Sequence, residues 1–322
     1  MTSLFERISK ANTAIRPQVL VTPLDRSGML SAALGCEALL KCDHLQPTGS
    51  FKIRGATNKI HELSAEARSR GVITASTGNH GQAVARAGAA AGVTVTVYVA
   101  ASTTPAKMAA IKAQGGELVV VEGPAIQAEL RARQRAAEQG KVYISPYNDI
   151  DVVAGQGTIG LELVKQAPDL DAVFIAVGGG GLIGGAGTAI KHLRPRTRVV
   201  GVWPANSVSM LRSLEAGEIV EAPEYPTLSD GTAGAVEPGS ITFPICQAVI
   251  DATISVTEAE IAEAMRRIAQ AERWMVEGAA GVAMAGLVKQ AQAYRGRKVA
   301  VVLCGRNIAL ETFREAVGPV PS

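Results

Sequence analysis

Short apolar runs alternate along the chain with longer stretches in which apolar residues recur at helical spacing. Before residue 146 the apolar runs lie at 72–76, 94–99, 118–121 and 142–145, and helical stretches separate them at 81–91, 105–114 and 126–139. Because a parallel strand returns to its sheet through a crossover of helix length, this order predicts parallel strands with helices on both faces. We therefore expect an α/β fold.

The same alternation continues through the rest of the chain. A stretch at 221–244, rich in proline, glycine and serine, predicts a long loop near a site or an interface. Thr257 and Glu260 have the spacing of a capping box at the start of a helix. The further predicted strands are 19–24, 38–42, 172–177, 198–203 and 298–303. The further predicted helices are a first one before residue 19, then 53–67, 152–166, 182–192, 257–274 and 277–293, and a final one after residue 307.

Composition and charge narrow the class of protein. The 34 glycines, 47% hydrophobic residues and 4% aromatic residues are typical of an α/β enzyme with many tight turns. The net charge of +3 is spread along the chain without a basic block, so we expect no nucleic-acid partner. The first seven residues contain charges and no apolar stretch, which predicts no signal peptide and a cytoplasmic location.

One uncharged run, at 172–190, is long enough to suggest a membrane span. Seven glycines interrupt it, four of them consecutive, so we interpret it as a strand followed by a loop and expect no membrane partner. The four cysteines and four histidines lie far apart and lack the spacing of a zinc site. We expect free thiols and no metal.

Four polar loops follow predicted strands, at 46–52, 76–81, 178–181 and 304–307. Ligands of open α/β sheets bind outside the carboxyl ends of the strands, so we expect the four loops to converge. Lys52 stands in the first of them between Phe51 and Ile53, where partial desolvation would lower the pKa of its amine toward a nucleophile. A solvated lysine beside a turn has the same local pattern.

The tetraglycine of residues 178–181 is the clearest candidate for binding a phosphate, because backbone N–H groups without side chains can surround an anion at a helix N-terminus. Gly179, Gly181 and Gly184 also have the G-x-G-x-x-G spacing of a dinucleotide site. That site needs an acidic residue about twenty positions later, and the strand at 198–203 has none. The alternative is a flexible turn packed against a helix.

The other two loops also allow two interpretations each. The residues at 76–81 would form a nest for a carboxylate, or else an ordinary N-cap in which Ser76, Thr77 or Asn79 caps the helix and His80 has no role. Cys304 is a candidate because it directly follows the last strand. A lone cysteine is otherwise a small buried hydrophobic residue.

Taken together, these motifs resemble the fold-type II pyridoxal-phosphate enzymes, most closely the branch of threonine/serine dehydratases (ammonia-lyases) and serine racemases. The resemblance runs in order over nearly the whole chain. Its motifs are TPL at 22–24, QPTGSFKIRGA at 46–56, TGNHGQ at 77–82, GQGT at 155–158, GGGGL at 178–182 and CGRN at 304–307.

The resemblance implies a tryptophan synthase β-like fold of two open parallel-sheet domains, a large cofactor-binding domain at 1–50 and 146–322 and a small domain at 51–145. It implies a homodimer with pyridoxal 5'-phosphate as the cofactor and an amino acid as the substrate. Lys52 would bind the cofactor covalently and act as a catalytic base. The other cofactor-binding residues would be Phe51, Asn79, Gly178, Gly179, Gly180, Gly181, Leu182 and Cys304, and the substrate carboxylate would lie on Ser76, Thr77, Gly78, Asn79 and His80.

The implied reaction is elimination of water from an L-β-hydroxy amino acid, which gives a 2-oxo acid and ammonia. A neutral thiol at the pyridine nitrogen, supplied by Cys304, favours prompt loss of a β-hydroxyl over a long-lived carbanion. The alternatives are a racemase or β-replacement enzyme of the same family, and a non-catalytic protein that binds a nucleotide or metabolite through the tetraglycine.

Three residues depart from the pattern of the family. Thr77 stands where the racemase branch has its serine acid/base and would be the second catalytic residue. Its methyl group restricts the hydroxyl, so we expect racemisation to be secondary. Trp203 replaces a glutamate with which relatives bind a cation. Arg306 replaces a small residue, which predicts a larger or more polar substrate than threonine and resembles a subgroup associated with hydroxyectoine utilisation.

Overall fold

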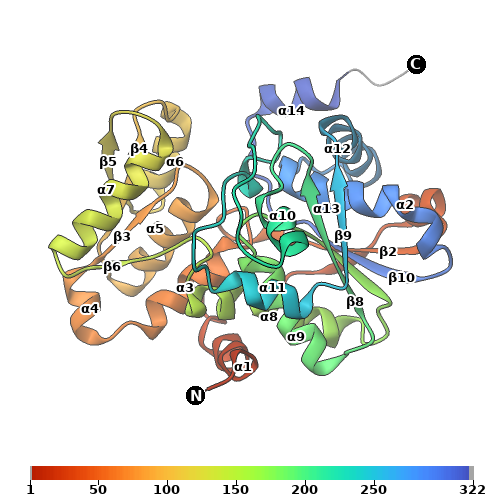
Figure 1. The fold of residues 1–322 in the computed structure, drawn as a ribbon, viewed down its shortest axis with the longest axis horizontal. Coiled ribbons are helices and arrows are strands. Elements are labelled where there is room, and N and C mark those ends of the chain that lie inside the picture. Colours follow the sequence, from red (N-terminus) through yellow and green to blue (C-terminus); the bar gives the residue numbers. More distant parts are fainter. Residues whose placement is uncertain (1, 319–322) are drawn as a thin grey trace.

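The computed structural model describes residues 2–318 and confirms the α/β fold. Two sheets lie on opposite sides of the molecule, each with helices on both faces (Figure 1). The helices are α1 (Leu4–Ala14), α2 (Gly28–Leu34), α3 (Lys52–Glu62), α4 (Ala65–Arg70), α5 (Asn79–Ala91), α6 (Pro105–Ala113), α7 (Ala125–Glu138), α8 (Ile150–Gln166), α9 (Gly181–Leu193), α10 (Ser209–Ala216), α11 (Thr242–Val249), α12 (Glu258–Glu272), α13 (Gly278–Lys289) and α14 (Leu310–Val317).

The smaller sheet is parallel throughout and has the strand order β5-β4-β3-β6. Side chains alternate between its faces: Val72 and Val97 pack with α5, whereas Ile73 and Tyr98 pack against α7. Apolar residues on both faces explain why these strands read as continuous apolar runs. The strands are β3 (Val72–Ala75), β4 (Val95–Ala100), β5 (Glu117–Val121) and β6 (Val142–Tyr143).

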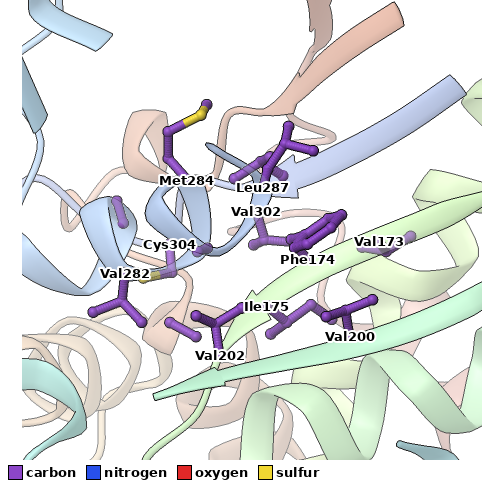
Figure 2. Close-up of a cluster of buried hydrophobic side chains, with 14 of the residues drawn as sticks. Val173, Phe174, Ile175, Val200, Val202, Val282, Met284, Leu287, Val302 and Cys304 are labelled. Carbon is purple, nitrogen blue, oxygen red and sulfur yellow. The ribbon is translucent and has the colours of Figure 1, made fainter. Parts of the chain in front are cut away.

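The larger sheet has the order β1-β2-β10-β7-β8-β9, and only the β1–β2 pair is antiparallel. Its core includes Phe174, Val202 and Val302 from the central strands, packed with Val282 and Leu287 of α13 (Figure 2). The strands are β1 (Leu24–Arg26), β2 (Glu37–Lys41), β7 (Ala172–Ala176), β8 (Arg198–Pro204), β9 (Ala252–Val256) and β10 (Lys298–Val302).

Helices α3 and α8 cross with their backbones in close contact. A Cβ on Gly155 would lie 2.5 Å from the carbonyl oxygen of Arg54 and 2.6 Å from the Cα of Gly55. The side chain of Gln156 accepts a hydrogen bond from the N–H of Gly55 (3.1 Å), and Thr158 accepts one from Arg54 (3.0 Å). The GQGT motif at 155–158 thus holds the helix that begins at Lys52.

Most predicted elements are confirmed to within a few residues, and the differences have local causes. The strand predicted at 19–24 begins only at Leu24, because the backbone groups of Leu20 and Thr22 bind the buried side chains of Gln46 and Lys41 instead of a neighbouring strand. The helix predicted at 53–67 is two helices, α3 and α4, because Ser64 caps a new one. The pattern missed α2, α10, α11 and β9.

The stretch at 221–244 is mainly loop, as predicted, with a short 3₁₀ turn at Asp230–Thr232 and the start of α11. No helix among residues 2–318 combines the length and apolar composition that a bilayer crossing needs.

Candidate functional site

The lysine turn and the loop after the last strand lie side by side. The N–H of Phe51 donates to the carbonyl of Cys304 (3.0 Å), and the N–H of Arg306 donates to the carbonyl of Gly49 (2.9 Å). Gly49 has a φ of +74°, which favours glycine, and a Cβ there would also collide with the side chain of Asn307. Two of the four predicted loops therefore converge through backbone pairing.

Lys52 is half-buried at the first position of α3. Its Nζ donates to the carbonyl of Pro146, 2.9 Å away. Burial lowers the pKa of this amine to about 8, although the nearby Cys304 and Glu277 act in the opposite direction. The amine is thus desolvated, as the flanking residues predicted, and part of it is neutral near pH 8.

Asn79 joins the second loop to the same place. Its Nδ2 donates to the two carboxylate oxygens of Glu277 (2.9 and 3.0 Å), and its Oδ1 accepts from the side chain of Asn307 (2.6 Å). The backbone N–H of Asn307 also donates to Glu277 (3.1 Å). These bonds fix the orientation of the Asn79 amide.

Glu277 is a site residue that the sequence analysis missed. It is buried, and burial raises the pKa of its carboxyl group to about 7. A Cβ on Gly305 would collide with this carboxylate, so the glycine of the CGRN motif leaves room for it. An acidic residue ahead of a small-residue helix is an ordinary helix-start signal, so the sequence has no feature that singles out Glu277.

The loop at 76–81 does not form the ordinary side-chain cap. Gly78 is the N-cap of α5, and no side chain caps that helix. Ser76 to Asn79 are half-buried around its free N–H groups, whereas His80 is buried with its Nε2 3.0 Å from the carbonyl of Ile144. Burial, helped by Lys52, lowers the pKa of His80 to about 3, so the ring is neutral and donates from Nε2.

The tetraglycine loop also leads to a helix without a side-chain cap. Gly180, at φ +84°, is the N-cap of α9, and the first turn of that helix has no acidic residue. A Cβ on Gly178 would meet the backbone of Thr232 at 2.8 Å, and one on Gly179 would collide with the ring of Tyr147. Steric clashes thus exclude side chains at Gly178 and Gly179. The free N–H groups at the start of α9 suit an anion.

Cys304 closes the site at the end of β10. It is buried beside Val282 at the edge of the hydrophobic core (Figure 2). Burial, and next the charge of Glu277, raises the pKa of its thiol well above the usual range, so the thiol is neutral. Leu182 and Phe51 are buried as well.

The side chains of two of the departing residues, Trp203 and Arg306, form no hydrogen bond with Lys52. Trp203 is buried in the core with its ring close to Gly201. The side chain of Arg306 is exposed. Burial, and next the charge of Arg306, lowers the pKa of His44 to about 4. Across residues 2–318, no three His, Cys, Asp or Glu side chains gather in a way that could hold a metal.

These residues fit the pyridoxal phosphate that the resemblance implies. A desolvated amine and a fixed amide for a ring oxygen lie beside the loop that follows β10, and an uncapped glycine loop for a phosphate follows the neighbouring strand β7. The N-terminus of α5 offers a second group of free N–H donors for a carboxylate.

Comparison with known proteins gives the same family. The family model described as "Pyridoxal-phosphate dependent enzyme" matches residues 15–305. The chain is 39% identical to a putative threonine dehydratase of Sinorhizobium fredii, over 98% of this chain and 95% of that protein. It is 40% identical to an L-threonine ammonia-lyase of Thermotoga maritima, over 94% of this chain and 75% of the relative.

Solved structures agree with the sequence relatives. The processed threonine deaminase isoform 2 of Solanum lycopersicum superposes with a TM-score of 0.93 at 34% identity, covering 97% of this chain and 92% of the other. Maize serine racemase superposes with a TM-score of 0.91 at 30% identity, covering 97% and 96%.

Proposed function

Because this chain belongs to the family of pyridoxal-phosphate dependent enzymes, we propose that it removes water from an L-β-hydroxy amino acid of the threonine or serine type and releases a 2-oxo acid and ammonia. The observation that carries the proposal is the desolvated amine of Lys52 beside an uncapped glycine loop. The names of the relatives point to the same reaction: threonine dehydratase, L-threonine ammonia-lyase and threonine deaminase.

In this proposal Lys52 binds the cofactor and, once released, takes the proton from Cα. Bound pyridoxal phosphate supplies an electron sink for the bond that breaks at Cα. An amine with a pKa of about 8 is partly neutral at physiological pH, which suits a general base. The carbonyl of Pro146 accepts a hydrogen bond from the free amine and orients it.

The remaining residues hold and orient the reactants. The backbone N–H groups of residues 178–182 would hold the phosphate, Asn79 would hold the 3-oxygen of the ring, and Phe51 would pack beside the ring. Cys304 would offer a neutral thiol to the ring nitrogen. The free N–H groups at the start of α5 bind the substrate carboxylate, with His80 contributing its backbone because its ring is bound to Ile144.

The proposal extends to domains and assembly. A small domain at 51–145 is supported by the smaller sheet, whose strands all lie within that range, and the large domain is then 1–50 and 146–322. Assembly as a homodimer, a cytoplasmic location and the absence of a nucleic-acid partner stay predictions.

The test joins spectroscopy to a panel of substrates. Purified protein with added pyridoxal phosphate should have a visible absorption band that borohydride removes, and Lys52→Ala should lack that band. Serine, threonine, 3-hydroxyaspartate and phenylserine are then assayed for release of 2-oxo acid and for inversion at Cα. Release of 2-oxo acid should dominate.

Two results would overturn the proposal. One is wild-type protein that stays colourless with added cofactor. The other is dominant inversion at Cα that Thr77→Ala abolishes while ammonia release is unchanged, which would make racemisation the main activity.

A further inference from the structure

The four residues 145–148, which lie between β6 of the smaller sheet and α8, touch the site at more than one place. The carbonyl of Pro146 accepts the hydrogen bond from Lys52 Nζ (2.9 Å). The next residue, Tyr147, lies against the tetraglycine loop, where Cβ atoms on Gly179 or Gly181 would be too close to it. The position of this short segment therefore affects both the lysine and the phosphate loop.

Glu237, in the long loop at 221–244, binds two neighbouring residues of this segment. Its carboxylate accepts a hydrogen bond from Asn148 Nδ2 (3.0 Å), and its backbone N–H donates to the hydroxyl oxygen of Tyr147 (3.0 Å). Asn148 Oδ1 accepts in turn from the N–H of Ile241 (3.0 Å). The last two residues of the segment are thus bound to the long loop.

The same long loop reaches the glycines directly. Thr242 Oγ1, at the start of α11, donates to the carbonyl of Gly179 (2.6 Å). Tyr147 packs against the glycine loop, and Thr242 of the long loop hydrogen-bonds to it. A shift of residues 237–242 relative to 145–148 would change the shape of the glycine loop.

Arg133, on helix α7 of the smaller sheet, also binds Glu237. Arg133 of α7 donates from Nη2 to Glu237 Oε1 (2.7 Å) and stacks on the ring of Tyr143, with its Cζ 4.4 Å from the ring centroid. The side chains of Arg133 and Glu237 are 37% and 27% exposed, so solvent weakens the ion pair without removing it. The carboxylate of Glu237 therefore accepts hydrogen bonds from α7 of the smaller sheet and from the segment at 145–148.

We propose that Glu237 is a positioning residue for the cofactor: by binding Asn148 and Arg133 together, it holds Tyr147 against the tetraglycine loop and the Pro146 carbonyl at Lys52. This inference rests on the proposed function, because the cofactor is what the positioned groups bind. Glu237 does not touch the cofactor in this scheme and acts through its neighbours.

The test compares Glu237→Ala with Glu129→Ala. Glu129 also binds Arg133 Nη2 (2.7 Å), one turn away on the same helix, but it forms no hydrogen bond with residues 145–148. Both variants remove a carboxylate from Arg133, and only the first releases Asn148. Loss of a charged hydrogen bond predicts that Glu237→Ala raises the dissociation constant of pyridoxal phosphate about tenfold, measured by visible absorption, while Glu129→Ala stays at the wild-type value.

A second measurement uses the full chain without cofactor. Glu237→Ala should accelerate hydrogen exchange of the backbone amides at 145–148 and 178–182, and Glu129→Ala should leave both segments unchanged. Glu237→Gln, which keeps an acceptor oxygen for Asn148, should recover much of the affinity for the cofactor.

The inference is wrong if Glu237→Ala and Glu129→Ala have equal effects on affinity and exchange. It is also wrong if Glu237→Ala lowers only the thermal midpoint, which is the result of a purely structural role. Wild-type protein that fails to bind pyridoxal phosphate would contradict the proposed function, and the exchange measurement on the chain without cofactor would still decide the role of Glu237.

Discussion

At the scale of single residues, the site depends on groups whose charge is set by burial. Lys52 and Glu277 are pushed in opposite directions: the amine is easier to deprotonate and the carboxylic acid is harder to ionise. Glu277 receives hydrogen bonds from Asn79 and Asn307, so its carboxylate determines which way the Asn79 amide points. An asparagine that binds a ring oxygen needs that fixed orientation.

Glu277→Gln should change how stability depends on pH. The folded protein holds the Glu277 proton with a pKa of about 7, above its ordinary value of 4.5. The protonated carboxyl group contributes its full stabilisation below pH 4.5, and this contribution is lost as the pH rises through 7. The loss is on the order of 3 kcal/mol of unfolding free energy, and the glutamine variant avoids it because its side chain does not ionise.

Urea unfolding of the cofactor-free protein between about pH 4 and pH 8 measures this difference. The free energy of unfolding of the variant should increase relative to that of the wild type as the pH rises across that window. Unfolding free energies that run parallel at all pH values would contradict a raised pKa for Glu277.

At the scale of elements, glycine sets the distance between helices. The GQGT motif at 155–158 contacts α3 through Gly155 and binds it through Gln156 and Thr158. Because α3 begins at Lys52, the crossing of α3 and α8 fixes where the amine emerges. The motif therefore acts on the site through packing and not by contact with a ligand.

Gly155→Ala should destabilise the protein by about 3 kcal/mol, because the new methyl group would meet the backbone of Arg54 and Gly55, which cannot move without separating the helices. Gly28→Ala is the control, since a Cβ there meets nothing within 4 Å. Chemical denaturation gives both values. Equal midpoints for the two variants would show that the helices separate at little cost.

At the scale of the whole molecule, a buried cluster of charged side chains joins α3, which begins at Lys52, to β2 and α8. The guanidinium of Arg54 donates to both oxygens of Asp43 (2.7 and 2.8 Å) and of Glu162 (2.7 and 2.9 Å), and Lys41 also donates to Glu162 (2.6 Å). Arg54 and Asp43 are fully buried. The cluster connects the end of β2, the first turn of α3 and the middle of α8.

Arg54→Met should cost about 4 kcal/mol of unfolding free energy, because it leaves two buried carboxylates without their main partner. The control is Arg70→Met, which breaks an exposed i,i+4 pair with Glu66 and should change stability by roughly 0.5 kcal/mol or less. If the two variants lose similar amounts of stability, the cluster does not support the fold as proposed.

The sequence by itself determined the elements and the motifs. Alternating apolar runs and helical stretches are local signals, so they located most strands and helices, and the glycines of 178–181 and the lysine turn were recognisable because backbone exposure and desolvation follow from neighbouring residues. The element predictions failed where backbone groups bind side chains from distant segments, as at Leu20 and Thr22.

Only the tertiary structure decided which distant groups meet. Glu277 lies far from Asn79 in the sequence, and its role appears only because the fold places the start of α13 beside the start of α5, where the two side chains are 2.9 Å apart. The same holds for Glu237, which binds Asn148 and Arg133 from a loop whose composition predicts no particular contact. Pairing, burial and raised or lowered pKa values are properties of the surroundings in space, so no local pattern encodes them.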